Sequence, residues 1–146
     1  MFNDNEGTLY LEYEPEKDLQ MVSLSDGTQS ESIWIYLVNA GASLSVYAVS
    51  GGGQVASINC GTYESITANS GIVKVAATYK TNEFKAFVNG SLVATDTSGA
   101  TPIGLNTVEF KYPTSSAYNT KAKIKSLYYF PEVLTDTELQ QLTSNT

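Results

Sequence analysis

Apolar residues recur at every second position in short runs along this chain, and this two-residue period is the strongest constraint on its fold. In residues 33–38, Ile33, Ile35 and Leu37 fall on one face of an extended segment, and Trp34 and Tyr36 fall on the other. Clusters of glycine, asparagine, aspartate and serine separate the runs at the spacing typical of an all-β sandwich. We predict nine or ten strands, at residues 8–13, 21–24, 33–38, 43–49, 54–59, 72–79, 84–88, 92–95, 107–112 and 121–130.

Two local signals mark where strands turn and where the sheet gives way to helix. Asn89 and Gly90 lie between two predicted strands, and both tolerate the positive φ that a two-residue hairpin requires. Near the C-terminus, Thr135 and Glu138 form a capping-box pattern ahead of Leu139. We therefore expect a hairpin at residues 89–90 and a short C-terminal helix that covers one end or edge of the sandwich.

The basic residues number 8 and are all lysine, against 15 acidic residues and a formal net charge of -7, so the chain contains no arginine and no histidine. Without histidine it cannot build a Ser-His-Asp or Cys-His nucleophile or a histidine-ligated zinc site. Without arginine it lacks the two-pronged donor that dominates recognition of phosphate and guanine. The negative charge also repels nucleic acid and anionic membranes, so we expect neither as a partner.

The length of 146 residues and the even distribution of apolar residues predict a single domain over residues 1–146. The lone Cys60 cannot form an internal disulfide and is expected to be a small buried hydrophobe. The N-terminal residues have neither a positively charged region nor an apolar core, and no stretch is long enough to cross a membrane. We therefore expect no signal peptide and no membrane insertion.

Several aromatic side chains fall on the face of the predicted sheet opposite the aliphatic core. Trp34 and Tyr36 share this face in one strand, and Tyr47 falls on the corresponding face of the next. One interpretation is a shallow platform for sugar rings, because the C–H faces of a pyranose pack on aromatic rings without any charge. The other is that the rings are core, or are covered by a loop, the terminal helix or a neighbouring subunit. Large exposed apolar patches are rare on soluble monomers, which favours burial.

Two further tyrosines, Tyr112 and Tyr118, flank a loop of small polar residues, a composition that suits adaptable recognition. Tyrosines in β-proteins are also often half-buried at strand ends. If the domain binds a ligand, the candidate residues are Trp34, Tyr36, Tyr47, Tyr112 and Tyr118.

The carboxylates suggest no catalytic or metal-binding constellation. Glu12 and Glu16 are the best candidates for a glycosidase pair, but a straight strand holds them about 13 Å apart instead of the ~5 Å that a retaining mechanism requires. Asp26 and Asp96 could each supply one calcium ligand from a loop, yet turn formation explains both, and Asp136 fits the first turn of the helix. We predict no catalytic residue, no metal and no cofactor, with calcium as an alternative that the sequence does not support.

Two segments resemble the concanavalin A-like, laminin G-like jelly-roll family. The first covers residues 75–93, in which a strand and a turn lead into the FVNG hairpin at 87–90 and a return strand. The second covers residues 123–139, similar to the family's closing strand and to its helix, here LTDTEL at 134–139. With residues 6–13 and 24–27 the resemblance spans most of the chain, and it is closest to the versions found in bacteriophage tail and fibre proteins.

The resemblance implies a two-sheet antiparallel jelly-roll sandwich, concanavalin A-like, whose first and last strands are neighbours and whose termini lie close together. Its members bind sugars, bind proteins or act as decoration. In the closing strand, Ile124, Leu127 and Tyr129 match the family's inward positions, although strict alternation does not connect the first two. A β-bulge near Lys125 and Ser126 would reconcile these positions.

These observations predict a non-enzymatic binding module of a phage structural protein that recognises host-surface carbohydrate, or another surface component, through aromatic and polar residues. The alternative is an architectural domain, such as a homotrimer or a fibre or capsid decoration, whose aromatic face contacts other virion proteins. A β-glycan hydrolase is the third hypothesis. Either of the first two places the domain on the virion, outside the cell.

Overall fold

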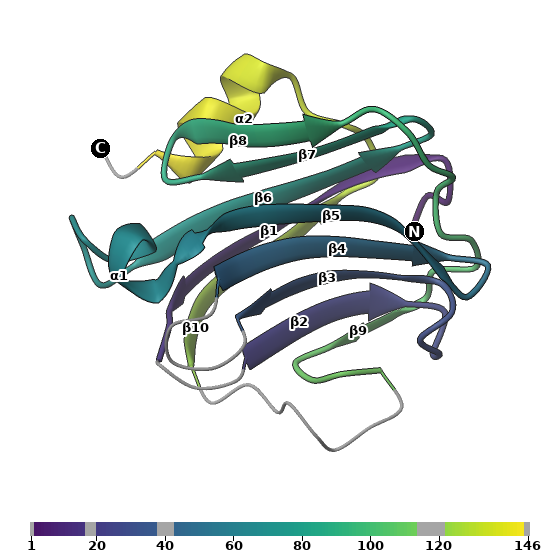
Figure 1. Ribbon diagram of the computed structural model, residues 1–146, viewed down its shortest axis with the longest axis horizontal. Coiled ribbons are helices and arrows are strands. Elements are labelled where there is room, and N and C mark those ends of the chain that lie inside the picture. Colours follow the sequence, from purple (N-terminus) through teal and green to yellow (C-terminus); the bar gives the residue numbers. More distant parts are fainter. Residues whose placement is uncertain (1, 17–19, 38–42, 114–121, 145–146) are drawn as a thin grey trace.

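In the computed structural model, two antiparallel sheets pack face to face and a helix near the C-terminus lies over one of them (Figure 1). The structure describes residues 2–16, 20–37, 43–113 and 122–144. The strands are β1 (Glu6–Glu14), β2 (Gln20–Ser25), β3 (Ser32–Leu37), β4 (Ser43–Ser50), β5 (Gly53–Thr62), β6 (Val73–Lys80), β7 (Glu83–Val88), β8 (Ser91–Asp96), β9 (Thr107–Glu109) and β10 (Lys123–Phe130). The helices are α1 (Tyr63–Ile66) and α2 (Asp136–Thr143).

The two sheets have the strand orders β10-β1-β6-β7-β8, which we call sheet A, and β5-β4-β3-β2-β9, which we call sheet B. The strand pairs within each sheet are antiparallel. The predicted two-sheet antiparallel sandwich with a short C-terminal helix is therefore confirmed. The prediction that the first and last strands are neighbours is also confirmed, because β1 pairs with β10.

The strand predicted at residues 107–112 is shorter in the structure, since β9 ends at Glu109. β9 pairs with β2 from Ser23 to Ser25. Beyond that point the Ser23 hydroxyl donates a hydrogen bond to the carbonyl of Lys111 at 3.0 Å. A side chain thus takes the place of the next ladder hydrogen bond, and the chain continues irregularly toward Tyr112.

The core between the sheets consists of the aliphatic side chains that alternation predicts. Ile33, Ile35 and Leu37 of β3 are all at most 2% exposed and pack in one cluster with residues of both sheets. Cys60 lies in the same cluster and is 7% exposed, which confirms its prediction as a buried hydrophobe. Because successive side chains of a strand point to opposite faces, the intervening aromatic residues of β3 lie on the outer face of sheet B.

The closing strand contains the β-bulge that the inward positions require. The pairing of β1 with β10 skips one residue of β10, between the partners of Glu12 and Tyr13. The skipped residue is Lys125, and Ile124 and Leu127 on its two sides both pack against the core. The predicted bulge is therefore confirmed.

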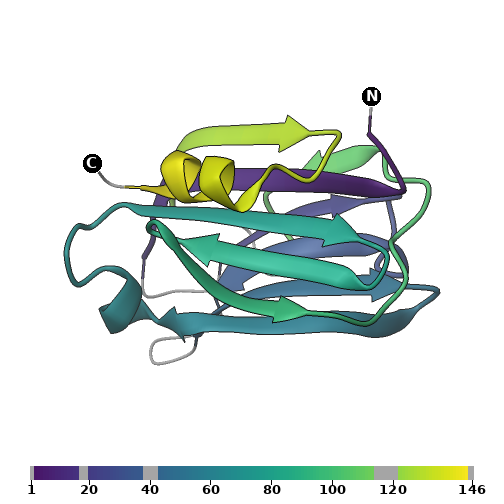
Figure 2. The ribbon, with the colours of Figure 1, turned by 90° about the horizontal axis from the view of Figure 1, so that it is seen from above.

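Helix α2 lies on the outer face of sheet A, and the prediction that it covers an end or edge of the sandwich is wrong (Figure 2). The capping box is confirmed: Thr135 Oγ1 accepts from the Glu138 N–H at 3.2 Å, and the Glu138 carboxylate accepts from the Thr135 N–H at 3.1 Å. Leu139 packs fully buried against Tyr10 and Phe87 of the sheet. The helix lies on the face because this face of sheet A carries large apolar rings that need a cover.

The ends of the described chain lie far apart along sheet A, unlike the close termini that the resemblance implies. The Tyr79 hydroxyl donates to the carbonyl of Asn3 at 2.6 Å, whereas the Lys74 ammonium donates to the carbonyl of Ser144 at 2.9 Å. Tyr79 and Lys74 mark opposite ends of β6, so α2 has carried the chain back along the sheet. Neither helix of the described ranges has the length and apolar character needed to span a bilayer.

Candidate functional site

An aromatic cluster occupies the outer face of sheet B. Trp34 of β3 pairs directly with Tyr47 of β4, and their rings stack with centroids 4.7 Å apart and planes inclined by 16°. Tyr36 follows on the same face of β3 and meets Trp34 and Tyr47 edge-on, at centroid distances of 6.3 and 6.2 Å. Three of the residues that the sequence singles out therefore touch one another at the middle of the sheet.

Tyr112 adds a fourth ring from the segment that follows β9. Its centroid lies 5.0 Å from that of Trp34, with the planes tilted by 55°. The Tyr112 hydroxyl donates to Gln29 Oε1 at 2.9 Å, and the Gln29 amide donates to the carbonyl of Pro113 at 3.2 Å. The loop between β2 and β3 thus holds Tyr112 against Trp34. We call Trp34, Tyr36, Tyr47 and Tyr112 the aromatic cluster; Tyr118 lies outside the described residues.

The members of the aromatic cluster differ in burial. Trp34 is only 9% exposed, whereas the three tyrosines are half-buried. For Trp34 the structure agrees with the interpretation that a loop residue covers the ring, because Tyr112 packs on it. A ligand that approached this face would meet the tyrosines first, with Trp34 supporting them from below.

Polar groups accompany the rings. Trp34 Nε1 is buried without a hydrogen-bond partner in the described part of the chain, and an unsatisfied buried donor costs about 1–3 kcal/mol. The strand register places Ser45 beside Tyr36 and Ser57 beside Tyr47. Burial raises the pKa of Tyr36 above its usual value, with the Ser45 hydroxyl acting in the opposite sense. Tyr36 therefore presents a neutral hydroxyl at physiological pH.

Charge plays little part at the aromatic cluster, whose members are all neutral side chains. Lys111 precedes Tyr112, but its ammonium lies 3.4 Å from the Glu109 carboxylate. Within the described ranges, no group of three or more histidine, cysteine, aspartate or glutamate side chains is arranged to hold a metal ion. Glu109 lies on the same face as Trp34, because both residues pair with Ser23 of β2. Apart from this ion pair, the described groups around the aromatic cluster are rings, hydroxyls and amides.

The loop carboxylates considered for calcium have structural partners. Asp26 Oδ1 accepts from the backbone N–H and the hydroxyl of Thr28, at 2.8 and 2.6 Å. Asp96 Oδ1 accepts in the same way from Ser98, at 3.1 and 3.3 Å. Both residues therefore form the turns that the sequence predicts.

The other singled-out carboxylates lie on sheet A or at α2, away from the aromatic cluster. Glu12 accepts from the Tyr10 hydroxyl at 3.4 Å, and Glu16 follows the end of β1 on the surface. Asp136 accepts from the Lys85 ammonium at 2.8 Å, in the first turn of α2 as predicted. Lys85 is mostly enclosed, and this hydrogen bond is the main cause of the rise in its pKa.

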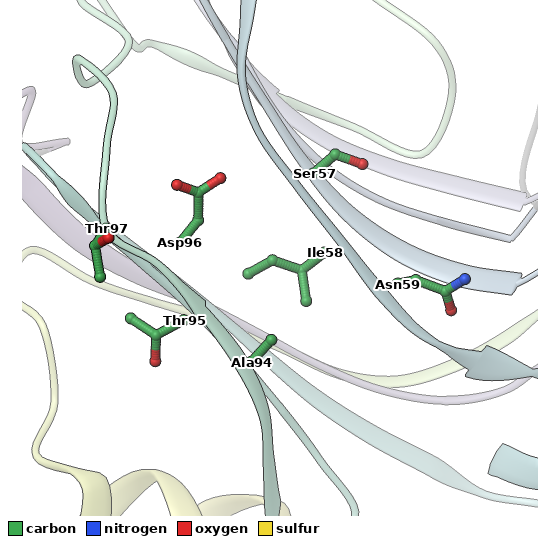
Figure 3. A pocket seen from close by; sticks show the side chains of 7 residues that line it. All are labelled: Ser57, Ile58, Asn59, Ala94, Thr95, Asp96 and Thr97. Carbon is green, nitrogen blue, oxygen red and sulfur yellow. The ribbon is translucent and has the colours of Figure 1, made fainter.

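A polar hollow of about 360 Å³ adjoins the aromatic cluster, between β5 and β8 (Figure 3). Its lining residues are Ser57, Ile58, Asn59, Ala94, Thr95, Asp96 and Thr97. The side chains of Ile58, Ala94 and Asp96 lie on the facing sides of the two strands, while Ser57 points to the opposite side of β5. No local sequence pattern predicts this hollow, because two edge strands from different sheets form it.

The comparisons with known proteins agree with the fold. Residues 2–140 match the family described as the concanavalin A-like lectin/glucanases superfamily. No curated protein matches the sequence. The family match spans nearly the whole chain, from before β1 into α2.

Several solved structures share the architecture at low sequence identity. The CBM40 module of the Ruminococcus gnavus IT-sialidase superposes with a TM-score of 0.76 at 21% identity, covering 97% of this chain and 84% of that chain. The leech intramolecular trans-sialidase superposes with a TM-score of 0.75 at 21% identity, covering 99% of this chain and 24% of that chain. The NanB sialidase of Streptococcus pneumoniae superposes with a TM-score of 0.74 at 16% identity, covering 99% of this chain and 25% of that chain. The R. gnavus module has also been solved with α2,3- and α2,6-sialyllactose bound.

Proposed function

Because the chain belongs to the concanavalin A-like lectin/glucanases superfamily, we propose that it is a non-catalytic carbohydrate-binding module whose ligand contacts the aromatic cluster. The observation that carries the proposal is the convergence of three half-buried tyrosines around Trp34 on the outer face of sheet B. The other outer face is occupied by α2. The likeness to a sialidase module solved with sialyllactose supports a carbohydrate as the ligand class.

The aromatic cluster supplies the contacts that a sugar ring needs. The exposed parts of Tyr36 and Tyr47 offer apolar surface for the C–H face of a pyranose. Tyrosine and serine hydroxyls both donate and accept hydrogen bonds, which matches the ring of hydroxyls on a sugar. Trp34 Nε1 lacks a partner among the described residues, so a ligand hydroxyl or a water that reached it would remove an energetic penalty.

The charge distribution favours an uncharged glycan. Sialyllactose carries a carboxylate, and proteins usually hold such a group with the arginine fork or a lysine ammonium. This chain has no arginine and a net charge of -7. The lysine next to Tyr112, Lys111, is paired with Glu109. We therefore expect neutral oligosaccharides to bind more tightly than their sialylated counterparts.

A glycan array followed by calorimetric titration of the purified domain tests this proposal. The expected result is saturable binding of one or more neutral glycans, with a lactose-based ligand preferred over its sialylated form. If the folded domain bound no glycan, the proposal would be refuted. Preference for sialylated glycans would leave carbohydrate binding standing and overturn the argument from charge.

Variants locate the site. Tyr36→Ala and Tyr47→Ala should each weaken binding about tenfold or more, because each removes a ring from the contact surface. Tyr128→Ala is the matched control, since Tyr128 is 52% exposed and belongs to β10 of the other sheet. Equal losses of affinity in all three variants, or a loss confined to Tyr128→Ala, would show that the ligand does not bind at the aromatic cluster.

For the parent protein, we propose a bacteriophage tail, fibre or other virion protein whose ligand lies on the host surface. The support is the resemblance of the FVNG hairpin and the closing helix to modules of such proteins. Binding of the labelled domain to bacterial cells, and its release by the glycan found on the array, is the expected result. A domain that binds glycans but no bacterial surface would refute the adhesion role alone. A stable trimer that buries the aromatic cluster would instead identify an assembly domain.

A further inference from the structure

The hollow between β5 and β8 continues the surface of the aromatic cluster around the edge of sheet B. Ser57 connects the two, because it pairs with Tyr47 on the sheet and also lines the hollow. Neighbouring strands lie about 4.8 Å apart, so Ser57 is one strand away from the rings. β5 and β8 are edge strands of their sheets, and one side of each backbone therefore presents N–H and C=O groups to this space.

Asp96 is the strongest polar group of the hollow and is held in a fixed position. Its Oδ1 accepts from the N–H and hydroxyl of Ser98, while its Oδ2 has no partner among the residues that the structure describes. The Asp96 carboxylate lies on the side of β8 that faces β5 (Figure 3). A carboxylate oxygen positioned in this way accepts strong hydrogen bonds from ligand hydroxyls.

The remaining lining matches the same kind of ligand. Ile58 and Ala94 give the hollow an apolar floor between the two strands (Figure 3). Thr95 and Thr97 also belong to the lining, but the Thr95 side chain lies on the side of β8 opposite to Asp96 and Ala94 (Figure 3). The lining contains a carboxylate and no cationic side chain, so an anionic ligand is disfavoured. An apolar floor beside one acceptor carboxylate and the backbone groups of two edge strands is complementary to an uncharged sugar ring.

We propose that this hollow and the aromatic cluster are two subsites of one extended site, which binds an uncharged glycan of several sugar units across β5. The inference rests on the proposed function, because it assumes that the aromatic cluster binds sugar. The volume of about 360 Å³ lies at the small end of ligand pockets and suits a mono- or disaccharide unit. The remainder of the glycan then continues over Ser57 onto Tyr47.

The test measures affinity against ligand length. Neutral unbranched cello-, malto-, xylo- and galacto-oligosaccharides, from the mono- to the hexasaccharide, are titrated into the wild-type domain and its variants. Wild-type affinity should rise with length until both subsites are filled. Asp96→Asn should lower the affinity for the longer oligosaccharides about tenfold. It should not change the affinity for the shortest ligands, which contact the aromatic cluster only. Asparagine keeps Oδ1, so the turn with Ser98 is retained.

Two further variants complete the design. Asp26→Asn is the matched control, because Asp26 forms the same kind of turn with Thr28 at the end of β2, and it should bind as the wild type does. Ala94→Leu should reproduce the effect of Asp96→Asn by filling the hollow from the exposed strand β8.

The outcomes separate this inference from the proposed function. Affinity that is independent of length, or insensitive to both Asp96→Asn and Ala94→Leu while Tyr47→Ala weakens binding, would overturn the extended site and leave the aromatic cluster as the binding site. Binding that depends on Asp96 but not on Tyr47 would overturn the two-subsite arrangement. No binding by any oligosaccharide of the series or of the array would overturn both proposals.

Discussion

Replacing Tyr112 with alanine should uncover Trp34. The Tyr112 ring packs 5.0 Å from the indole, and its hydroxyl donates to Gln29 at 2.9 Å. Trp34 is the single tryptophan of the chain, so tryptophan fluorescence reports on the surroundings of this one side chain. The substitution therefore has a direct optical readout.

The expected loss of stability follows from the two contacts. An aromatic pair contributes about 0.5–1.5 kcal/mol and a hydrogen bond about 0.5–1.5 kcal/mol, which together give about 1–3 kcal/mol. Because Tyr112 is half-buried and not fully enclosed, the lower part of that range applies, about 1–2 kcal/mol. For a domain of this length, such a change lowers Tm by about 3–8 °C. Tyr112→Phe keeps the ring and loses only the hydrogen bond to Gln29.

The assay combines the emission maximum of Trp34 with acrylamide quenching. Tyr112→Ala should shift the emission to longer wavelength and raise the quenching constant, whereas Tyr112→Phe and the distant Tyr128→Ala should match the wild type. If Tyr112→Ala were quenched no more than the wild type, Tyr112 would not be what shields the indole. The assignment of this residue as the cover of Trp34 would then be wrong.

Three further outcomes concern stability. Thr135→Ala should lower the free energy of unfolding by about 1 kcal/mol in urea titrations by removing the capping box, with Thr137→Ala in the same exposed turn as the near-neutral control. Leu139→Ala should cost about 2–5 kcal/mol, clearly more than Leu142→Ala, because only Leu139 is fully enclosed beneath α2. Burial raises the pKa of the Cys60 thiol from 9.0 to about 12, so the unfolded chain ionises first and stability should fall as pH rises between these values. Cys60→Ala should make this part of the pH profile less steep, while buried Tyr13 and Tyr79, whose pKa values burial also raises, keep part of the slope. An unchanged slope would show that Cys60 does not contribute to it.

The sequence predicts the sandwich well because an antiparallel strand with one buried face permits only one register. Ile33 and Trp34 could not exchange faces without moving the aliphatic core into solvent. Helix α1 is not predicted from the sequence, because it comprises only Tyr63–Ile66 and is too short to show a helical period. Its one local signal is Thr62, whose hydroxyl accepts from the Ser65 N–H at 3.3 Å.

The sequence predicts only the part of the site that lies on strands that are consecutive in the chain. Trp34, Tyr36 and Tyr47 come together through alternation and the pairing of consecutive strands. The contact of Tyr112 with Trp34 depends on Gln29, which belongs to a separate loop. The hollow at Asp96 depends on how the edges of two sheets pack, and no short sequence pattern encodes that placement.

The two outer faces of the sandwich cover their aromatic rings in ways that differ in strength. On sheet A, Tyr10 and Phe87 lie beneath a capped helix that contributes Leu139 to their cluster, and the packing of Leu139 alone is worth about 2–5 kcal/mol. On sheet B, Trp34 lies beneath Tyr112, whose displacement costs about 1–2 kcal/mol, an amount that ring contacts and hydroxyl hydrogen bonds of a ligand can offset. A glycan that displaces Tyr112 should therefore change the Trp34 emission on binding, whereas one that packs on top of Tyr112 should leave it unaltered. Fluorescence during the sugar titration thus decides whether Tyr112 is a movable cover or part of the contact surface.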